Sequence, residues 1–215
     1  MLLSISCLNA EKLSEFVKKV NDSAADYIHV DVMDGEFVKN TNATIAEVER
    51  LKRLSKKPLD IHLMVADVIP NILLYRTVEP EFITFHYEAT KNIKDIIGLI
   101  KSFGIKVGIS IKPETDPSVL VPYLKALDLV LIMSVEPGAG GQAYINSDDK
   151  LKFLAKEIIS LNKKVIVSID GGINNKVLET MPIKPDMAVM GSYVSNKTNP
   201  VATIDKIKNT FKTTS

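Results

Sequence analysis

The segment "YIHVDVMDGEFVKN" at 27–40 places a histidine and an aspartate two residues apart inside an apolar run. Successive side chains of a strand point to opposite faces, so His29, Asp31 and Met33 share one face of the predicted strand. An imidazole and a carboxylate are costly to bury unless something pairs with them. Either the two groups satisfy each other's hydrogen bonds, or they converge on another group, for which a metal ion is one candidate.

Other residues that could bind a metal or transfer a proton lie at equivalent positions, near the ends of apolar runs. The chain has three histidines, and His62 and His86, like His29, lie late in apolar runs, while Asp170 follows another such run. Imidazoles and carboxylates bind divalent metals and transfer protons. One strand histidine alone is more often a hydrogen-bonded core residue, but the whole set indicates metal binding or catalysis. We expect His86 in the pocket wall and outside the metal-binding set.

Short β-branched apolar runs recur along the whole chain and predict the strands that position these residues. They occupy 2–6, 27–32, 59–64, 82–86, 106–111, 129–133, 165–169 and 187–191. Segments with helical spacing of apolar residues lie between them, including 9–20 with Asn9 as N-cap, 92–104 ending at Gly104, and 147–162. The segment 111–117 is interpreted as a strand-to-helix loop.

Eight strands, each followed by a helix with no break in composition, predict a single (β/α)8 TIM barrel over residues 1–215. An open, doubly wound sheet is the alternative. In such barrels the active site lies at the carboxyl ends of the strands, which is where the histidines and aspartates are expected.

Composition excludes several classes of partner. The 215 residues carry 27 Lys and Arg against 26 Asp and Glu, a net charge of +1, so no basic field would hold nucleic acid or an anionic membrane. The single Cys7 excludes an internal disulfide and a cysteine-rich zinc site. No apolar run is long enough to span a bilayer, and the N-terminus does not look like a signal peptide. We expect a cytoplasmic protein.

Six stretches carry a resemblance to a known family. They are "HVDVMDGEFVKN", "DIHLMV", "ITFHYEA", "MSVEPGAGGQ", "SIDGGIN" and "VMGS". In this order and at barrel spacing, the chain resembles ribulose-phosphate 3-epimerases from end to end. The resemblance implies a phosphorylated ketose as substrate, homo-oligomer formation, and one divalent metal ion per chain held by His29, Asp31, His62 and Asp170.

The same resemblance implies roles for further residues. Asp31 and Asp170 would also form the acid/base pair. The implied substrate-binding residues are Ser4, His62, Met33, Met64, Met133, Gly138, Ala139, Gly140, Gly141, Gly171, Gly172, Gly191 and Ser192. Met33 and Met64 each follow a proposed ligand by two residues, which favours pocket lining over core filling. Glycines after three strands would let backbone N–H groups approach a phosphate, a recurrent arrangement in this fold.

The implied reaction inverts the carbon next to a ketone, most simply D-ribulose 5-phosphate to D-xylulose 5-phosphate in the pentose phosphate pathway. Its proton is too weakly acidic for a free carboxylate, so a metal must stabilise the enediolate, and each face needs a proton-transfer group. Two aspartates on separate strands can serve two faces. The ligand set suits Zn, Fe, Mn or Co.

Alternative functions are an allulose 6-phosphate 3-epimerase, suggested by "SISCLNA", and a non-catalytic sugar-phosphate-binding barrel. A related decarboxylase or aldolase would need a lysine between aspartates, and 29–33 has none. Five positions depart from the family pattern and bear on the choice of sugar: Asn9, Glu36, Lys39, Ala139 and Ser168.

Overall fold

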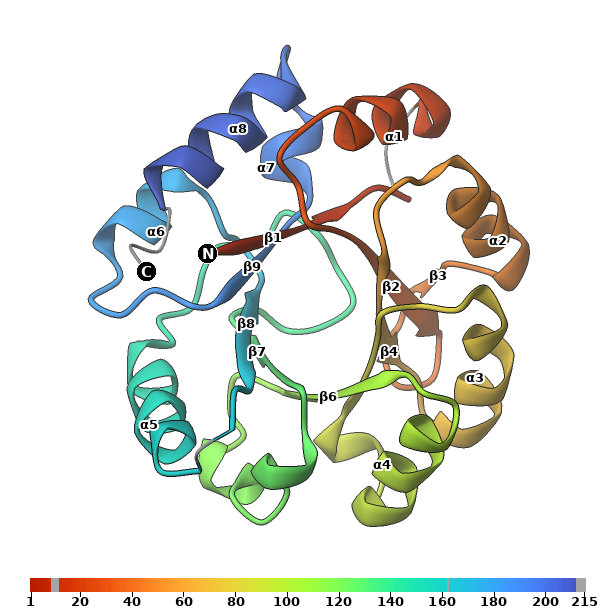
Figure 1. Cartoon of the computed structure of the whole chain (residues 1–215), viewed down its shortest axis with the longest axis vertical. Coiled ribbons are helices and arrows are strands. Elements are labelled where there is room, and N and C mark those ends of the chain that lie inside the picture. Colours follow the sequence, from red (N-terminus) through yellow and green to blue (C-terminus); the bar gives the residue numbers. More distant parts are fainter. Residues whose placement is uncertain (9–11, 162, 212–215) are drawn as a thin grey trace.

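The computed structural model describes residues 1–8, 12–161 and 163–211. Its strands are β1 (Leu2–Ser6), β2 (Tyr27–Asp34), β3 (Thr41–Asn42), β4 (Leu59–Met64), β5 (Phe82–His86), β6 (Lys106–Ile111), β7 (Leu129–Met133), β8 (Ile166–Asp170) and β9 (Met187–Met190). The sheet order is β1-β9-β8-β7-β6-β5-β4-β2-β3, and pairing of β1 with β2 closes it. Apart from the antiparallel β3, the strands form a parallel (β/α)8 barrel, as predicted (Figure 1).

Helices surround the barrel on its outside (Figure 1). They are α1 (Leu13–Asn21), α2 (Ile45–Leu54), α3 (Val68–Tyr75), α4 (Ile93–Ser102), α5 (Asp148–Ile159), α6 (Asn175–Thr180), α7 (Ser192–Ser195) and α8 (Pro200–Thr210). In α4 the predicted isoleucine face is buried, and Gly104 follows the helix with a φ of 73°. The predicted helix at 9–20 begins at Leu13, and the proposed cap Asn9 lies outside the described residues.

The fifth barrel strand, β6, departs from the predicted pattern because no α-helix follows it. Two short 3-10 helices, η3 (Pro117–Leu120) and η4 (Leu124–Ala126), connect β6 to β7. Pro122 lies between them, and a proline inside a helix removes a hydrogen bond and clashes with the preceding turn. The segment 111–117 is a loop after β6, as predicted.

Alternation along the strands separates an apolar layer from a polar barrel interior. In β2, Ile28 and Val30 are buried in the large core between barrel and helices, whereas His29 and Asp31 point inward. Phe82, Leu129 and Leu131 belong to a second apolar cluster that fills part of the interior. The barrel therefore holds its polar residues above and beside an apolar base.

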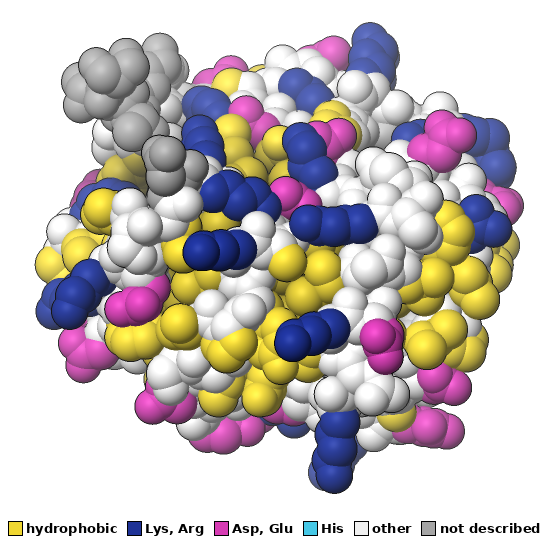
Figure 2. Space-filling view, turned by 60° about the horizontal axis from the view of Figure 1, so that its bottom comes forward, with side chains coloured by type: hydrophobic (Ala, Val, Ile, Leu, Met, Phe, Trp, Pro, Cys, Tyr) yellow, Lys and Arg dark blue, Asp and Glu magenta, His cyan; other side chains and the backbone are white. Residues whose placement is uncertain are grey.

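The surface carries none of the histidines. His29, His62 and His86 are at most 1% exposed, and the face in Figure 2 shows apolar side chains interspersed with lysines and acidic residues but no histidine. Cys7 is also buried, and burial raises the pKa of its thiol to about 12. No helix within the described ranges combines the length and apolar character that crossing a membrane requires.

Candidate active site

The two predicted ligand histidines and two aspartates converge inside the barrel. Asp31 Oδ1 lies 3.2 Å from His29 Nε2 and 3.1 Å from His62 Nδ1, and Asp170 Oδ2 lies 3.9 Å from His29 Nε2. One ligand atom from each residue falls within 4.8 Å of the other three. Atoms bound about 2.0–2.2 Å from a divalent ion stand roughly 3–4 Å from one another, so the donor set fits one ion.

The two aspartates differ in their electrostatic surroundings. Burial would raise the pKa of Asp31, but the imidazoles of His29 and His62 hold that pKa well below its usual range. Burial and the neighbouring Asp31 carboxylate raise the pKa of Asp170 to about 6. The pair therefore joins a firmly anionic carboxylate to one that binds a proton near neutral pH.

His29 is held from behind by a carboxylate. Its Nδ1 lies 2.8 Å from Asp60 Oδ2, and Ser4 Oγ donates to the same oxygen at 2.8 Å. Burial would lower the pKa of His29, but the Asp31 and Asp60 carboxylates raise it well above its ordinary value. Asp60 thus orients the ring so that Nε2 faces the ligand cluster, a common arrangement behind metal-binding histidines.

His62 is held from behind by a second histidine. Its Nε2 lies 3.0 Å from His86 Nε2, and His86 Nδ1 lies 3.1 Å from Glu88 Oε2. Burial lowers the pKa of His86 to about 4, so this imidazole is neutral near neutral pH. His86 therefore lies against a predicted ligand and outside the ligand cluster, as expected. Its side chain is fully buried, however, and does not form the pocket wall, so that part of the expectation was wrong.

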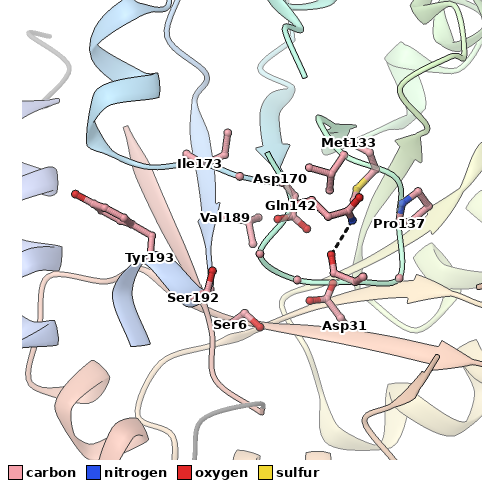
Figure 3. Close-up of a pocket in the computed structure, with 18 of the residues that line it drawn as sticks. Ser6, Asp31, Met133, Pro137, Gln142, Asp170, Ile173, Val189, Ser192 and Tyr193 are labelled. Atoms are coloured by element: carbon pink, nitrogen blue, oxygen red, sulfur yellow. Dashed lines mark hydrogen bonds between the residues drawn. The ribbon is translucent and has the colours of Figure 1, made fainter. Parts of the chain in front are cut away.

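A cavity of about 590 Å³ opens above the ligand cluster at the carboxyl ends of the strands. Figure 3 shows Asp31 and Asp170 reaching into it from β2 and β8, with Ser192 at another part of the wall. The predicted residues in its lining are Asp31, Met33, Met64, Met133, Gly138, Ala139, Gly140, Gly141, Asp170, Gly171, Gly172, Gly191 and Ser192. The fold thus brings the aspartates, the methionines and all three glycine loops to one space.

Three predicted residues lie beneath the cavity wall. Ser4, His29 and His62 are buried and are not part of the lining, so a substrate contact for Ser4 and His62 stays a prediction. Ser6, two residues after Ser4 and on the same strand face, reaches the cavity instead. The period of two along β1 was the signal that could have found it.

Sequence reasoning also missed Asp60 and Lys197. Asp60 lies two residues before His62 on the same strand face, which is the pattern that identified the His29–Asp31 pair. Lys197 follows α7 and is the one Lys or Arg among the described lining residues, with its Nζ 4.7 Å from the Tyr193 ring centroid. No local motif distinguishes it from the other surface lysines.

The loop after β2 and the glycine loop after β7 contact each other at the cavity mouth. Asn40 Nδ2 donates to the Gly138 carbonyl at 2.6 Å, and a Cβ on Gly138 would meet the Val38 Cβ at 2.7 Å. Asp34 and Gly35 form the predicted turn, with a φ of 81° at Gly35. Glycine at 138 is therefore needed for these two loops to pack together.

The sequence is similar to those of known proteins. A sequence model of the ribulose-phosphate 3 epimerase family matches residues 1–195. The chain belongs to this family. The ribulose-phosphate 3-epimerase of Buchnera aphidicola subsp. Baizongia pistaciae is 36% identical over 218 residues, covering 98% of this chain and 96% of its own. That of Bacillus subtilis strain 168 is 33% identical over 211 residues, covering 95% and 96%. The protein is therefore an isomerase of the ribulose-phosphate 3-epimerase type.

Solved structures of other enzymes share the epimerase fold at low identity. Orotidine 5'-phosphate decarboxylase from Pyrococcus horikoshii OT3 has a TM-score of 0.69 at 13% identity, covering 99% of this chain and 100% of its own. The 3-hexulose-6-phosphate synthase from Salmonella typhimurium has a TM-score of 0.67 at 16% identity, covering 97% of each chain. These likenesses support the barrel architecture alone.

Proposed function

We propose that this epimerase interconverts D-ribulose 5-phosphate and D-xylulose 5-phosphate, a step of the pentose phosphate pathway. The names of its relatives, which are ribulose-phosphate 3-epimerases, and the cavity that joins carboxylates to glycine loops support this substrate. The observation that carries the proposal is the placement of Asp31 and Asp170 on different strands around one cavity. Inversion at one carbon requires proton transfer on two faces, and this placement can serve both.

A divalent ion fits the proposal, and its ligands would be His29, Asp31, His62 and Asp170. The four donors lie within 4.8 Å of one another and combine two imidazoles with two carboxylates, a set that suits Zn²⁺, Fe²⁺, Mn²⁺ or Co²⁺. When bound, the ion would supply Lewis-acid stabilisation of the negative charge that develops on the ketone oxygen.

The two carboxylates would act as an acid/base pair with complementary protonation. Asp31 stays anionic because its histidine partners lower its pKa, so it can accept the proton at the third carbon. Asp170, with a pKa raised to about 6, can hold the proton that is returned to the opposite face. Reversal of the reaction exchanges these roles.

The substrate phosphate would lie at the other side of the cavity, against the loops after β8 and β9. Backbone N–H groups at Gly171, Gly172, Gly191 and Ser192 can approach an anion closely because little or no side chain intervenes. Lys197 adds a positive charge to the same wall. Glycine loops after the last two barrel strands are a recurrent phosphate site in this fold.

The proposal is tested with Asp170→Asn and His62→Ala, measuring metal content and epimerisation of both ketose phosphates. We expect Asp170→Asn to abolish epimerisation, a loss of at least a thousandfold, while one epimer still exchanges its proton with deuterated water when metal is retained. His62→Ala should lower metal content and activity together.

Three outcomes would contradict parts of this assignment. Normal epimerisation by metal-loaded Asp170→Asn would remove Asp170 from catalysis. Full activity of rigorously metal-free protein would remove the ion. Faster turnover of allulose 6-phosphate than of ribulose 5-phosphate would reassign the substrate. The homo-oligomeric state and cytoplasmic location remain predictions, which light scattering and cell fractionation would test.

A further inference from the structure

A chain of buried polar side chains runs outward from His62. His62 Nε2 contacts His86 Nε2 at 3.0 Å, and His86 Nδ1 contacts Glu88 Oε2 at 3.1 Å. Both imidazoles are fully buried, and the Glu88 side chain is 21% exposed. Each interior nitrogen of the chain therefore has one protein partner and little access to water.

The outer end of this chain is fixed by donors alone. Glu88 Oε1 accepts the Lys112 backbone N–H at 2.9 Å and the Thr115 hydroxyl at 2.5 Å. Lys150 Nζ donates to the carbonyls of Lys112 and Thr115 at 2.8 and 2.7 Å, which holds this loop after β6 in place. Burial opposes ionisation, yet hydrogen bonds from His86 and Thr115 lower the pKa of Glu88 to about 2. Glu88 is thus a carboxylate that can only accept.

An obligatory acceptor at Glu88 sets the direction of every bond in the chain. His86 Nδ1 must carry a hydrogen to donate to the carboxylate. The ring is fully buried and its Nε2 faces an imidazole rather than a carboxylate, so it holds only that one hydrogen and Nε2 is an acceptor. His62 Nε2 must then carry a hydrogen and donate to it. The remaining nitrogen of His62, Nδ1, faces Asp31 Oδ1 at 3.1 Å and is the atom that belongs to the ligand cluster.

Ring packing prevents His86 from turning to another arrangement. The Phe37 ring centroid lies 4.8 Å from that of His86, and the His62 centroid lies 5.0 Å from it. Lys112 Nζ lies 4.7 Å from the Phe37 centroid. The imidazole is therefore enclosed by aromatic neighbours as well as hydrogen-bonded at both nitrogens.

We propose that His86 and Glu88 are positioning residues that hold His62 in the one tautomer whose Nδ1 lone pair faces the metal site. This inference rests on the proposed function, because the hydrogen-bonded chain His62–His86–Glu88, here called the relay, can position a metal ligand only if His62 binds an ion. Asp60 orients His29 directly through one hydrogen bond, whereas Glu88 orients His62 through the intervening imidazole of His86.

The first test compares His86→Leu with His86→Gln, two side chains of similar size. Leucine removes the acceptor for His62 Nε2–H, whereas the glutamine side chain can place an amide oxygen about where Nε2 stands. Affinity for Zn²⁺, Fe²⁺, Mn²⁺ and Co²⁺ is measured by chelator competition. We expect His86→Leu to bind about 10–100-fold more weakly than the wild type, and His86→Gln to recover most of that loss.

The second test compares Glu88→Ala with Glu81→Ala, a control at the opposite end of the same barrel unit, where Glu81 pairs with Lys106 at the surface. Glu88→Ala should weaken metal binding at least tenfold, and ¹⁵N spectra of the zinc-loaded variant should show His86 in mixed tautomers. Glu81→Ala should leave both unchanged, and thermal melts of all variants report folding.

The outcomes separate this inference from the proposed function. If the wild-type protein binds none of the four divalent ions, the proposed metal site is wrong. If the wild type binds an ion and both His86→Leu and Glu88→Ala bind it equally well, the relay is wrong and the metal site stands. A loss of affinity in His86→Gln equal to that in His86→Leu would also overturn it.

Discussion

Aspartates around the barrel's mouth differ in role because their partners differ. Asp31 and Asp170 belong to the ligand cluster. Asp60 instead lies behind His29 and accepts a hydrogen bond from the Ser4 hydroxyl. Asp34 serves as an anchor, since its two oxygens accept backbone N–H groups from two loops. One residue type would thus serve in the proposed proton transfer, in the orientation of a histidine and in the attachment of loops.

Asp34 gives a residue-level prediction about stability and pH. Its Oδ1 accepts the N–H groups of Glu36 and Phe37 at 2.9 Å, and its Oδ2 accepts that of Ala66 at 2.7 Å. Burial would raise the pKa of Asp34, but these N–H groups lower it below the ordinary 3.8. Its contribution to stability is therefore complete above pH 3.8 and is lost as the pH falls through the lowered pKa.

Asp34→Ala should reduce the free energy of unfolding by about 1–2 kcal/mol at pH 7, because three backbone donors lose a charged acceptor but gain some water. Urea titrations from pH 7 to pH 3 measure the free energy of unfolding of the variant and the wild type. The difference between the two values should narrow in the most acidic samples. Asp67→Ala is the control, since the Asp67 side chain makes no capping hydrogen bond to α3. A gap that widens in acid would contradict the assigned role.

At this scale the sequence predicted the ligand cluster but not what supports it. The period of two along a strand placed His29 and Asp31 on one face, and the resemblance to the epimerases added His62 and Asp170. The structure brings these four side chains together. The relay partner Glu88 lies beyond β5, where no periodicity applies. Its partner Thr115 is 27 residues away, and the parallel pairing of β5 with β6 brings them together.

Among the elements, the loop after β8 depends on two adjacent glycines. Gly171 has a φ of 115° and Gly172 a φ of 63°, a region that residues with a Cβ rarely adopt. A Cβ on Gly172 would meet the Tyr144 backbone nitrogen at 2.5 Å and the Gln142 carbonyl oxygen at 2.8 Å. The loop after β8 therefore packs directly on the backbone that follows the glycine loop after β7.

Gly172→Ala should disturb both loops together. The left-handed conformation alone costs an alanine about 1–2 kcal/mol, and contact with unyielding backbone adds to it. We expect a loss of at least 2 kcal/mol in chemical denaturation and a fall of about tenfold or more in kcat/KM for the phosphorylated ketose. Gly140→Ala is the matched control for stability, because a Cβ there would meet nothing within 4 Å. Equal stability of the two variants would show that the loops are not interlocked.

The sequence predicted the bounds of a strand correctly where a single short apolar run defined it. The strands at 2–6, 59–64, 82–86, 106–111 and 129–133 are observed with the predicted bounds. The two-residue β3 was missed because it pairs with the end of β2 and has no apolar alternation of its own. The missing helix after β6, the fifth barrel strand, was signalled by Pro122, which the prediction from regularly repeated units did not take into account.

For the whole molecule, a repeated hydrogen-bond pattern joins the strands at the barrel's amino-terminal rim. An aspartate immediately precedes three of the strands: Asp26 before β2, Asp128 before β7 and Asp186 before β9. Each aspartate forms hydrogen bonds with one residue of the preceding strand, which is Leu3 in β1, Val107 in β6 or Val167 in β8. The aspartate's N–H donates to that residue's carbonyl, and its Oδ2 accepts that residue's N–H at 2.8–3.0 Å. These paired hydrogen bonds, here called clasps, extend the parallel ladder by one residue before the start of β2, β7 and β9.

The clasps predict additive losses of stability that leave catalysis intact. Asp26 binds Leu3 and pairs with Lys208, whereas Asp128 binds Val107 and pairs with Lys163, so the two sites share no partner. They lie four strands apart in the sheet order, at the rim opposite the cavity. Asp26→Ala and Asp128→Ala should each lower the free energy of unfolding by about 1–2 kcal/mol, because a partly buried N–H loses its acceptor.

Urea denaturation of the single and double variants measures this, with Asp149→Ala as a control at a fully exposed side chain. The double variant should lose the sum of the two single effects within about 0.5 kcal/mol, because distant sites without common partners act independently. Metal affinity and kcat should match the wild type in all three variants. A double loss well above the sum would mean that the two sides of the rim are coupled through the closed barrel, and a fall in metal affinity would mean that the rim also positions the ligand strands.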